Sequence, residues 1–432
     1  MVEVGRCKMK SLLIDGGCVL NGQIKVQGSK NAALPIIAAS LLFPGKTVLQ
    51  ECPQIRDVEL MKNLLECLGC EVSSRENCLS VEAGEAKVNN LPARWVGGMR
   101  SSILLLGAML ARFHSAVICY PGGCVIGERP IDLHIMALEK LGAEIHIEGE
   151  CIIAKATNLK GCKIQFPISS VGATEQAILA ACGAQGITDL YNAATEPEVV
   201  HLCRFLHSAG IEIQGIGCKH LRITGQSFAK NYPGEIQYTI PADRIVAGTY
   251  LLMAAACGGE IYLENGQSQE MEALLAVTRQ LGSRVEGSKT DLPGGIFLKA
   301  EKNLKAPEKI VTGPYPEFPT DMQPILAATL SKADGESIIE ETVFENRFCY
   351  VSELEKMGGK FRTDNRRLSV YPAYLHGACV QAADLRGGAA LVLAGLIAEG
   401  RTKVENAHFI ERGYEDIVRD LRKLGAKITS ET

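Results

Sequence analysis

The sequence predicts an α/β protein of two domains, built from one structural unit that is repeated six times. The chain has 432 residues, which is too long for a single ordinary hydrophobic core. A Leu-rich segment that stops at a glycine and continues into a short apolar stretch recurs roughly 70 residues apart. The glycines of these copies are Gly69, Gly142, Gly210, Gly282, Gly358 and Gly425. A small-residue-rich segment precedes each copy, so each unit should run strand, helix, strand, helix, strand.

The Leu-rich segments predict helices with one apolar face. In the first copy, Leu64, Leu65 and Leu68 are spaced three and four residues apart, which places them on one side of a helix. The glycine after each segment suits the left-handed conformation that ends many helices. The apolar or β-branched residues that follow predict a short strand.

The small-residue segments predict inner helices, which are apolar on nearly all sides and must therefore be buried. They occupy residues 31–42, 101–111, 173–184, 245–256, 322–331 and 387–398. Short strands such as KTVLQE, AVICY and TKVEN follow them. Three units around an axis would bury their inner helices at the centre of one domain. The predicted domains are 30–239 and 1–29 plus 240–432, with the N-terminal strand in the second.

Composition and charge exclude several classes of function. Lys plus Arg is 45 and Asp plus Glu is 49, so with a net charge of −4 neither nucleic acid nor a membrane is an expected partner. The apolar runs are far shorter than the roughly 20 residues that cross a bilayer. The N-terminus lacks a signal-peptide pattern, so a cytoplasmic protein with reduced thiols is expected. Cys67 and Cys70 have no second pair at zinc spacing, so no metal is expected.

Polar residues gather where each inner helix should start, and several of them are cationic. The polar segments are 28–31, 98–101, 170–174, 243–244, 320–321 and 384–387. Helix N-termini attract anions, and the cations near these starts are Lys30, Arg100, Arg129, Arg386 and Arg412. Each alone is explained as a capping or salt-bridging residue. Their recurrence favours a site in the cleft between the domains for ligands with phosphate and carboxylate groups.

Asp321 is the candidate general base. It follows Thr320 at the start of the fifth inner helix, in the segment GPYPEFPTDMQ. A carboxylate at this point is either a helix cap or a group that accepts a proton from a substrate hydroxyl.

Cys124 is the candidate reactive thiol. It lies in PGGCVIGERP, where the glycines predict a mobile loop. Arg129 and the helix start after Pro130 provide positive potential, which favours the thiolate. The apolar Val125 and Ile126 would equally suit a surface loop that packs on its neighbour.

Nine motifs resemble the UDP-N-acetylglucosamine 1-carboxyvinyltransferase family of enolpyruvyl transferases. In chain order they are GSKNAALP, GGMRSS, PGGCVIGERPIDLH, SSVGATE, NAATEPE, FPTDMQ, ETVFENRF, DLRGGAALVLAGLIAEG and ERGYE. The resemblance implies two pseudo-threefold domains, each an inverse α/β prism. It implies transfer of the enolpyruvyl group of phosphoenolpyruvate to the 3-hydroxyl of UDP-N-acetylglucosamine, with release of phosphate and without metal or organic cofactor. This reaction is the first committed step of peptidoglycan synthesis.

The resemblance also implies residue roles. Cys124 would protonate the methylene carbon of phosphoenolpyruvate and form a covalent phospholactoyl adduct, and Asp321 would take the proton of the sugar hydroxyl. The donor would be bound by Lys30, Asn31, Arg129, Arg347, Arg386 and Arg412, of which Lys30 and Arg412 are also implied in catalysis. The nucleotide sugar would be bound by Asn31, Arg100, Arg129, Pro130, Ile131, Asp132, Leu133, Ser170, Val171, Gly172, Asp321 and Val343. Asp57 and Asp384 would support these groups, in a monomer or weak homo-oligomer.

Three positions depart from the family pattern, and other functions stay open. Ile168 stands where some members have lysine, Ala242 is an extra residue, and the charge of Glu317 would disfavour an ionised base nearby. One alternative is a catalytically weak paralogue with a binding or regulatory role. Another is 3-phosphoshikimate 1-carboxyvinyltransferase, which lacks the motif around Cys124. A third is a redox or metal sensor built on Cys67 and Cys70.

Cys124 is expected to be alkylated selectively by an epoxide analogue of phosphoenolpyruvate such as fosfomycin, because Arg129 favours its thiolate. Peptide mass spectrometry identifies the labelled residue. Cys124→Ser should lose the label while iodoacetamide still modifies other thiols. Label on the remaining cysteines of the wild type would contradict the assignment.

Overall fold

The computed structural model describes residues 10–88, 91–122, 130–228, 234–287, 294–301 and 303–431. These residues form two compact units. The first unit comprises 28–122 and 130–241, and the second comprises 10–27 and 242–431. Within the part of the chain that is described, no helix is both long enough and apolar enough to cross a membrane.

The first unit holds three repeats. Its helices are α1 (Lys30–Ser40), α2 (Arg56–Cys67), α3 (Ala93–Val96), η1 (Arg100–Ile103), α4 (Leu104–Phe113), α5 (Asp132–Lys140), α6 (Val171–Ala181) and α7 (Pro197–Ser208). Its strands are β3 (Lys46–Gln50), β4 (Glu71–Arg75), β5 (Cys78–Glu82), β6 (Ser115–Cys119), β7 (Glu144–Glu148), β8 (Cys151–Lys155), β9 (Lys163–Gln165), β10 (Ile187–Tyr191), β11 (Glu212–Gln214), β12 (His220–Thr224) and β13 (Glu235–Thr239). The described strands form sheets in the orders β13-β3-β5-β4, β6-β8-β7 and β11-β12-β10-β9.

The second unit repeats this arrangement. Its helices are α8 (Arg244–Cys257), η2 (Ser268–Glu270), α9 (Glu272–Gln280), η3 (Thr320–Met322), α10 (Gln323–Leu330), α11 (Val351–Lys356), α12 (Leu385–Ile397), η4 (Ala407–Arg412) and α13 (Ile417–Lys423). Its strands are β1 (Ser11–Asp15), β2 (Gly22–Lys25), β14 (Glu260–Glu264), β15 (Arg284–Gly287), β16 (Ile296–Lys299), β17 (Lys309–Val311), β18 (Ser337–Glu340), β19 (Lys360–Asp364), β20 (Arg367–Tyr371), β21 (Cys379–Gln381), β22 (Arg401–Glu405) and β23 (Lys427–Glu431). The sheets run β15-β16-β14-β2, β17-β18-β20-β19 and β21-β22-β1-β23.

Five of the six sheets contain one more strand than the sequence predicts for a unit, whereas the β6-β8-β7 sheet contains three described strands. In the fourth repeat, α8 is followed by β14, which pairs in parallel with β2. Helix α9 then leads into the antiparallel pair β15 and β16. The predicted final strand is thus the first arm of a hairpin. In the sixth repeat, β1 lies antiparallel to both β22 and β23, so the N-terminal strand pairs with strands near the C-terminus.

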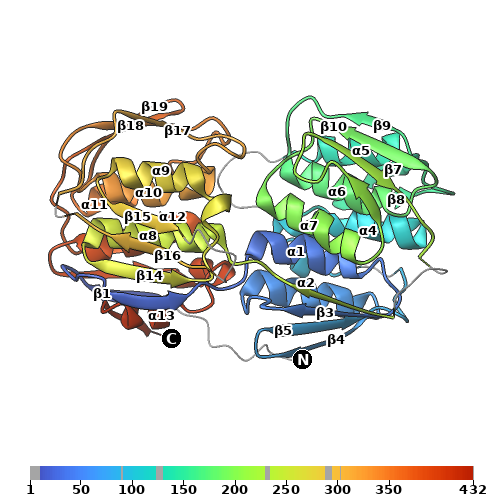
Figure 1. Ribbon diagram of the computed structural model, residues 1–432, viewed down its shortest axis with the longest axis horizontal. Coiled ribbons are helices and arrows are strands. Elements are labelled where there is room, and N and C mark those ends of the chain that lie inside the picture. The colour runs from blue at the N-terminus through green and yellow to red at the C-terminus, as the bar shows by residue number, and fades with distance from the viewer. Residues whose placement is uncertain are drawn as a thin grey trace. The chain divides into compact units, whose positions relative to one another are not determined.

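The six inner helices are confirmed, and they form the centre of each unit. In Figure 1, α8, α10 and α12 run through the interior of the second unit, between β17–β19 on one side and β1 and β14 on the other. Small residues permit this packing. A Cβ atom at Gly107 on α4 would lie 2.8 Å from the carbonyl oxygen of Gln176 on α6. The outer helices end as predicted, with Gly69 and Gly425 among the glycines at positive φ, 88° and 98°.

The starts of the inner helices differ in how their backbone N–H groups are satisfied. Ser29, Ser170, Asp243 and Asp384 accept hydrogen bonds from the first turns of α1, α6, α8 and α12. The second and fifth inner helices begin instead as the 3-10 turns η1 and η3, on which Arg100 and Asp321 lie. These two turns present charged side chains that are not used as caps.

Candidate active site

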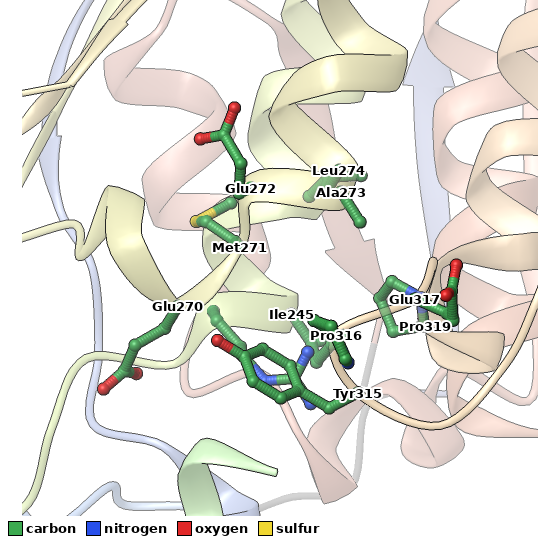
Figure 2. Close-up of a pocket in the computed structure, with 11 residues that line it drawn as sticks. Ile245, Glu270, Met271, Glu272, Ala273, Leu274, Tyr315, Pro316, Glu317 and Pro319 are labelled. Carbon is green, nitrogen blue, oxygen red and sulfur yellow. The ribbon is translucent and has the colours of Figure 1, made fainter. Parts of the chain in front are cut away.

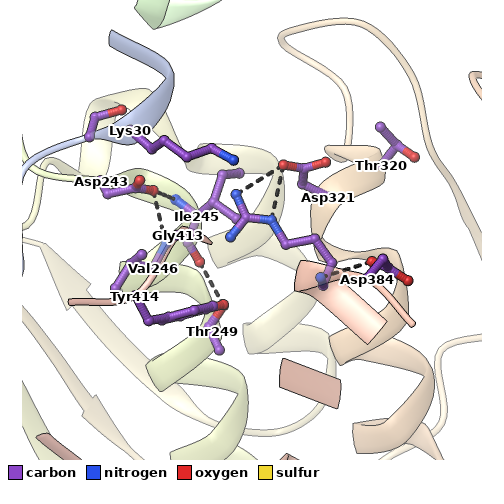
Figure 3. A network of polar contacts seen from close by, with 12 residues as sticks. Lys30, Asp243, Ile245, Val246, Thr249, Thr320, Asp321, Asp384, Gly413 and Tyr414 are labelled. Atoms are coloured by element: carbon purple, nitrogen blue, oxygen red, sulfur yellow. Dashed lines mark hydrogen bonds and ion pairs between the residues drawn. The ribbon is translucent and has the colours of Figure 1, made fainter. Parts of the chain in front are cut away.

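Asp321 lies on η3 in the second unit, and two arginines bind its carboxylate. Arg347 donates from Nη2 to Oδ1 at 2.9 Å, and Arg386 donates to Oδ2 from Nε at 3.1 Å and from Nη2 at 3.0 Å. The side chains of the two arginines are 3% and 4% exposed, whereas that of Asp321 is 30% exposed. Figure 3 shows Asp321 beside Thr320 on the turn, with the dashed lines of the guanidinium contacts. The structure therefore brings three predicted site residues together.

Arg386 is held at the start of α12 by Asp384. The Oδ1 atom of Asp384 accepts from the backbone N–H groups of Arg386 at 2.9 Å and of Gly387 at 3.0 Å, so it caps the helix. Burial alone would lower the pKa of Arg386, but the charges of Asp321 and Asp243 raise it above its ordinary value. Its buried Nη1 atom has no hydrogen-bond partner among the described residues. A bound anion would satisfy that atom.

One residue of this site was given no role by the sequence analysis, although it opens the motif ETVFENRF. Glu341 directly follows β18 and accepts from Thr320 Oγ1 at 2.8 Å. The carbonyl oxygen of Thr320 in turn accepts from Arg347 Nε at 3.3 Å. The signals in the sequence were its place at the start of that motif and a carboxylate directly after an apolar strand.

Val343 and Arg412 also belong to the second unit. Val343 lies in the turn after β18 and donates its backbone N–H to Glu341 at 2.8 Å. Arg412 ends η4, and a Cβ atom at the adjacent Gly413 would lie 2.6 Å from the side chain of Leu385. Because Leu385 directly precedes Arg386, the chain at Arg412 approaches the start of α12.

Lys30 and Asp57 form an ion pair in the first unit. Lys30 is the first residue of α1, and its Nζ atom lies 3.3 Å from Oδ2 of Asp57 on α2. The Asp57 side chain is 3% exposed and that of Lys30 is 14% exposed. The buried Asp57 carboxylate thus orients the Lys30 ammonium group. Asn31 follows Lys30 on the same helix and is half-buried.

The first unit also brings three predicted segments together. Arg100 on η1 donates from Nη2 to the carbonyl oxygen of Pro130 at 3.1 Å. Residues 130–133 lead into α5 and form its first turn, with Ile131 buried. Gly172 on α6 packs against His134 of α5, because a Cβ atom at Gly172 would lie 2.8 Å from the imidazole Nε2. Arg100, the 130–133 segment and the start of α6 are thus neighbours.

The start of α6 suits an anionic ligand. Ser170 Oγ accepts from the backbone N–H of Ala173 at 3.4 Å, and Val171 begins the helix. Helix N-termini bind phosphate through free N–H groups and the helix dipole. The predicted diphosphate role of Ser170, Val171 and Gly172 stays a prediction.

Cys124 and Arg129 lie outside the described residues. Their predicted roles as acid and phosphate ligand therefore stay predictions.

Two of the three residues that depart from the family pattern lie just before inner helices. The exposed Ile168 precedes α6, and the buried Ala242 lies just before α8.

A small pocket lies beside the starts of α8 and α9. Figure 2 shows Glu317 and Pro319 at one end of it and Glu270 at the other. The guanidinium of Arg244 lies 5.9 Å from the ring centroid of Tyr315 in its lining. Glu317 is exposed there, and its influence on Asp321 stays a prediction.

Burial makes several of the described thiols poor nucleophiles. It raises the pKa of Cys70 to about 11 and that of Cys203 to about 12. Cys18 differs, because a hydrogen bond with the Cys257 thiol lowers its pKa. Among the described residues, no group of three or more His, Cys, Asp or Glu side chains is arranged to hold a metal ion.

Comparison with known proteins places this fold and site in a family. The sequence model of EPSP synthase (3-phosphoshikimate 1-carboxyvinyltransferase) matches residues 14–421. UDP-N-acetylglucosamine 1-carboxyvinyltransferase 2 of Caldanaerobacter subterraneus subsp. tengcongensis is 43% identical over 97% of this chain and 99% of its own. The enzyme of that name from Chloroherpeton thalassium is 43% identical over 98% of both chains. The crystal structure of the enolpyruvyl transferase NikO from Streptomyces tendae has a TM-score of 0.87 and 24% identity, covering 99% of this chain and 100% of that chain.

Six repeats in two units, with a carboxylate between buried arginines, define a protein of the enolpyruvyl transferase fold, as predicted. The chain belongs to the UDP-N-acetylglucosamine 1-carboxyvinyltransferase family, within the wider EPSP synthase family. The resemblance that the nine motifs carried is thereby confirmed.

Glu175 is a buried carboxyl group on the helix whose start is the predicted diphosphate site. Its side chain lies in α6 and the residue is 5% exposed. Burial, followed by the charges of Glu198 and Glu196, raises its pKa well above the ordinary value of 4.5. The folded protein therefore keeps a proton on Glu175 that the unfolded chain releases.

Glu175→Gln is expected to stabilise the protein increasingly as the pH rises. Above pH 4.5 the unfolded wild type binds fewer protons at this position than the folded one, so wild-type stability falls until the pH passes the folded pKa. Glutamine removes this dependence. Urea unfolding at about pH 5 and about pH 8 measures it. The exposed Glu212→Gln on β11 is the matched control, and the same pH dependence in all three proteins would contradict the inference.

Proposed function

We propose that the protein transfers the enolpyruvyl group of phosphoenolpyruvate to the 3-hydroxyl of UDP-N-acetylglucosamine and releases inorganic phosphate. Relatives that are 42–43% identical over almost the whole chain carry the name of this activity. The structural observation behind the proposal is the Asp321 carboxylate between buried Arg347 and Arg386. In this proposal Asp321 is a proton acceptor beside two fixed positive charges, which is what addition of a hydroxyl to an anionic donor requires.

In the addition step, three bonds change together. Cys124 gives a proton to the methylene carbon of the donor, the sugar hydroxyl oxygen bonds to the adjacent carbon, and Asp321 accepts the hydroxyl proton. In the elimination step, the bond between that carbon and the phosphate oxygen breaks while the Cys124 thiolate takes a proton back from the methyl group and the double bond re-forms, and the proton held by Asp321 leaves with the phosphate. The products are the enolpyruvyl ether and inorganic phosphate. The Cys124 thiol can also add to the donor and form the phospholactoyl adduct.

Both units contribute residues to substrate binding. Arg347 and Arg386 hold the donor carboxylate, since their buried guanidinium groups keep their charge and geometry. Lys30, Arg129 and Arg412 hold the donor phosphate. The acceptor is bound by a set that shares polar groups and backbone N–H donors: Asn31, Arg100, residues 129–133, residues 170–172, Asp321 and Val343.

The substrates are small molecules, and the reaction needs no organic cofactor. We place the protein in the cytoplasm at the first committed step of peptidoglycan synthesis, as a monomer or weak homo-oligomer.

The purified protein is expected to release phosphate from phosphoenolpyruvate in the presence of UDP-N-acetylglucosamine and not with shikimate 3-phosphate. A colorimetric phosphate assay with each acceptor measures this. If phosphate is released only when shikimate 3-phosphate is the acceptor, the activity is that of 3-phosphoshikimate 1-carboxyvinyltransferase instead. Binding of both substrates without release would favour a weak paralogue with a binding or regulatory role.

Asp321→Asn is expected to lower kcat by roughly 10²–10⁴, the usual contribution of a general base. The KM for phosphoenolpyruvate should change far less, because asparagine still accepts a hydrogen bond from one arginine. Steady-state kinetics measure both constants. Asp364→Asn, at an exposed position of β19, is the matched control and should behave as wild type. Near-normal turnover of Asp321→Asn would reject the base assignment.

A further inference from the structure

Glu341 is a fully buried carboxylate that has no role in the chemistry described so far. Its Oε2 atom accepts from Thr320 Oγ1 at 2.8 Å, and its Oε1 atom accepts from the backbone N–H groups of Val343 at 2.8 Å and Phe344 at 3.1 Å. The residue is 0% exposed. Burying a carboxylate is costly even when it is hydrogen-bonded, and apolar side chains often replace such groups without loss of stability. Stability alone therefore does not account for a carboxylate at this position.

The groups that Glu341 binds belong to the two segments that build the Asp321 site. Thr320 directly precedes Asp321 on η3, and its carbonyl oxygen accepts from Arg347 Nε at 3.3 Å. The segment that follows Glu341 and leads to α11 carries Arg347, which donates to Asp321 at 2.9 Å. The contacts form a closed circuit from Glu341 to Thr320, Arg347 and Asp321. Moving the Glu341 carboxylate would move both sides of the ion pair.

The turn after β18 is anchored on its other side as well. Thr342 donates from Oγ1 to the carbonyl oxygen of Thr312 at 2.7 Å, and its backbone N–H donates to Thr312 Oγ1 at 3.1 Å. Phe344 places its ring centroid 5.7 Å from the guanidinium carbon of Arg347. A carboxylate attached to such a fixed turn can hold a neighbouring group in a defined place.

We propose that Glu341 is a positioning residue for the proton acceptor. Through Thr320 and the segment that carries Arg347, it sets where the Asp321 carboxylate meets the sugar hydroxyl, without touching either substrate. The proposal rests on the enolpyruvyl transfer proposed above. A displacement of about 1 Å can cost about a hundredfold in rate, so the effect of losing Glu341 falls on kcat.

The test uses the full chain and separates position from stability. The variants are Thr320→Val, Glu341→Gln, Glu341→Ala and the double variant Thr320→Val with Glu341→Ala. The control is Glu340→Gln, which changes the adjacent carboxylate that pairs with Lys309 at 2.7 Å. For each protein, kcat and KM for phosphoenolpyruvate are measured by phosphate release, and the thermal unfolding midpoint is recorded.

Thr320→Val removes the hydroxyl that Glu341 binds and is expected to lower kcat about tenfold or more, with KM within about threefold. Glu341→Ala should lower kcat about a hundredfold. Glu341→Gln should recover most of that loss, because its amide oxygen still accepts from the turn and its amide N–H can donate to Thr320. The double variant should be no slower than Glu341→Ala, since the two groups act as one unit.

Two results would overturn the proposal. One is an unchanged kcat in Thr320→Val together with a lowered unfolding midpoint, which assigns Glu341 to stability only. The other is a loss of kcat in the double variant equal to the product of the two single losses, which would mean that the two groups act independently. If Glu341→Ala fails to fold, Thr320→Val decides the matter. If wild type and Glu340→Gln release no phosphate with either acceptor, the proposed function fails first and the positioning role fails with it.

Discussion

The site in the second unit depends on one electrostatic constraint, the need of two buried guanidinium groups for a negative charge. Arg347 and Arg386 are nearly inaccessible to water, and an unpaired charge in such a place is strongly destabilising. Asp321 supplies the charge, so the arginines fix its position as much as it fixes theirs. Because 30% of its side chain remains exposed, the same carboxylate can still meet a ligand. The proposed binding of an anionic donor thus depends on the same interaction that completes the fold here.

The repeat explains why charged groups collect at the helix starts. A buried inner helix cannot leave its first N–H groups unsatisfied, and Ser29, Ser170, Asp243 and Asp384 satisfy them in four of the six repeats. The other two repeats begin with 3-10 turns that carry Arg100 and Asp321. The two inner helices that lack a side-chain N-cap thus carry residues for which a chemical role is proposed. This is expected, because functional sites often break the local rules that the rest of a fold follows.

Local patterns predicted the parts of the fold that local physics decides. The inner helices follow from runs of small apolar residues, and the ends of the outer helices follow from glycines such as Gly142 at a φ of 97°. The last strand of each hairpin was missed because it follows a turn at residues such as Asn365, whose φ of 50° no pattern announces. Glu341 was missed for another reason. Its partner Thr320 is 21 residues away in the chain, and only the tertiary fold brings the two side chains together.

Two carboxylates in one network therefore take different parts because they differ in burial and in the kind of donor that they meet. Glu341 is fully enclosed and accepts only from a hydroxyl and two backbone N–H groups, so it holds segments in place but cannot reach a ligand. Asp321 accepts from cations and is partly exposed, so its charge is tied to the fold on one side and open to substrate on the other. A carboxylate can act as a base only where water or substrate reaches it, and this separates the two roles.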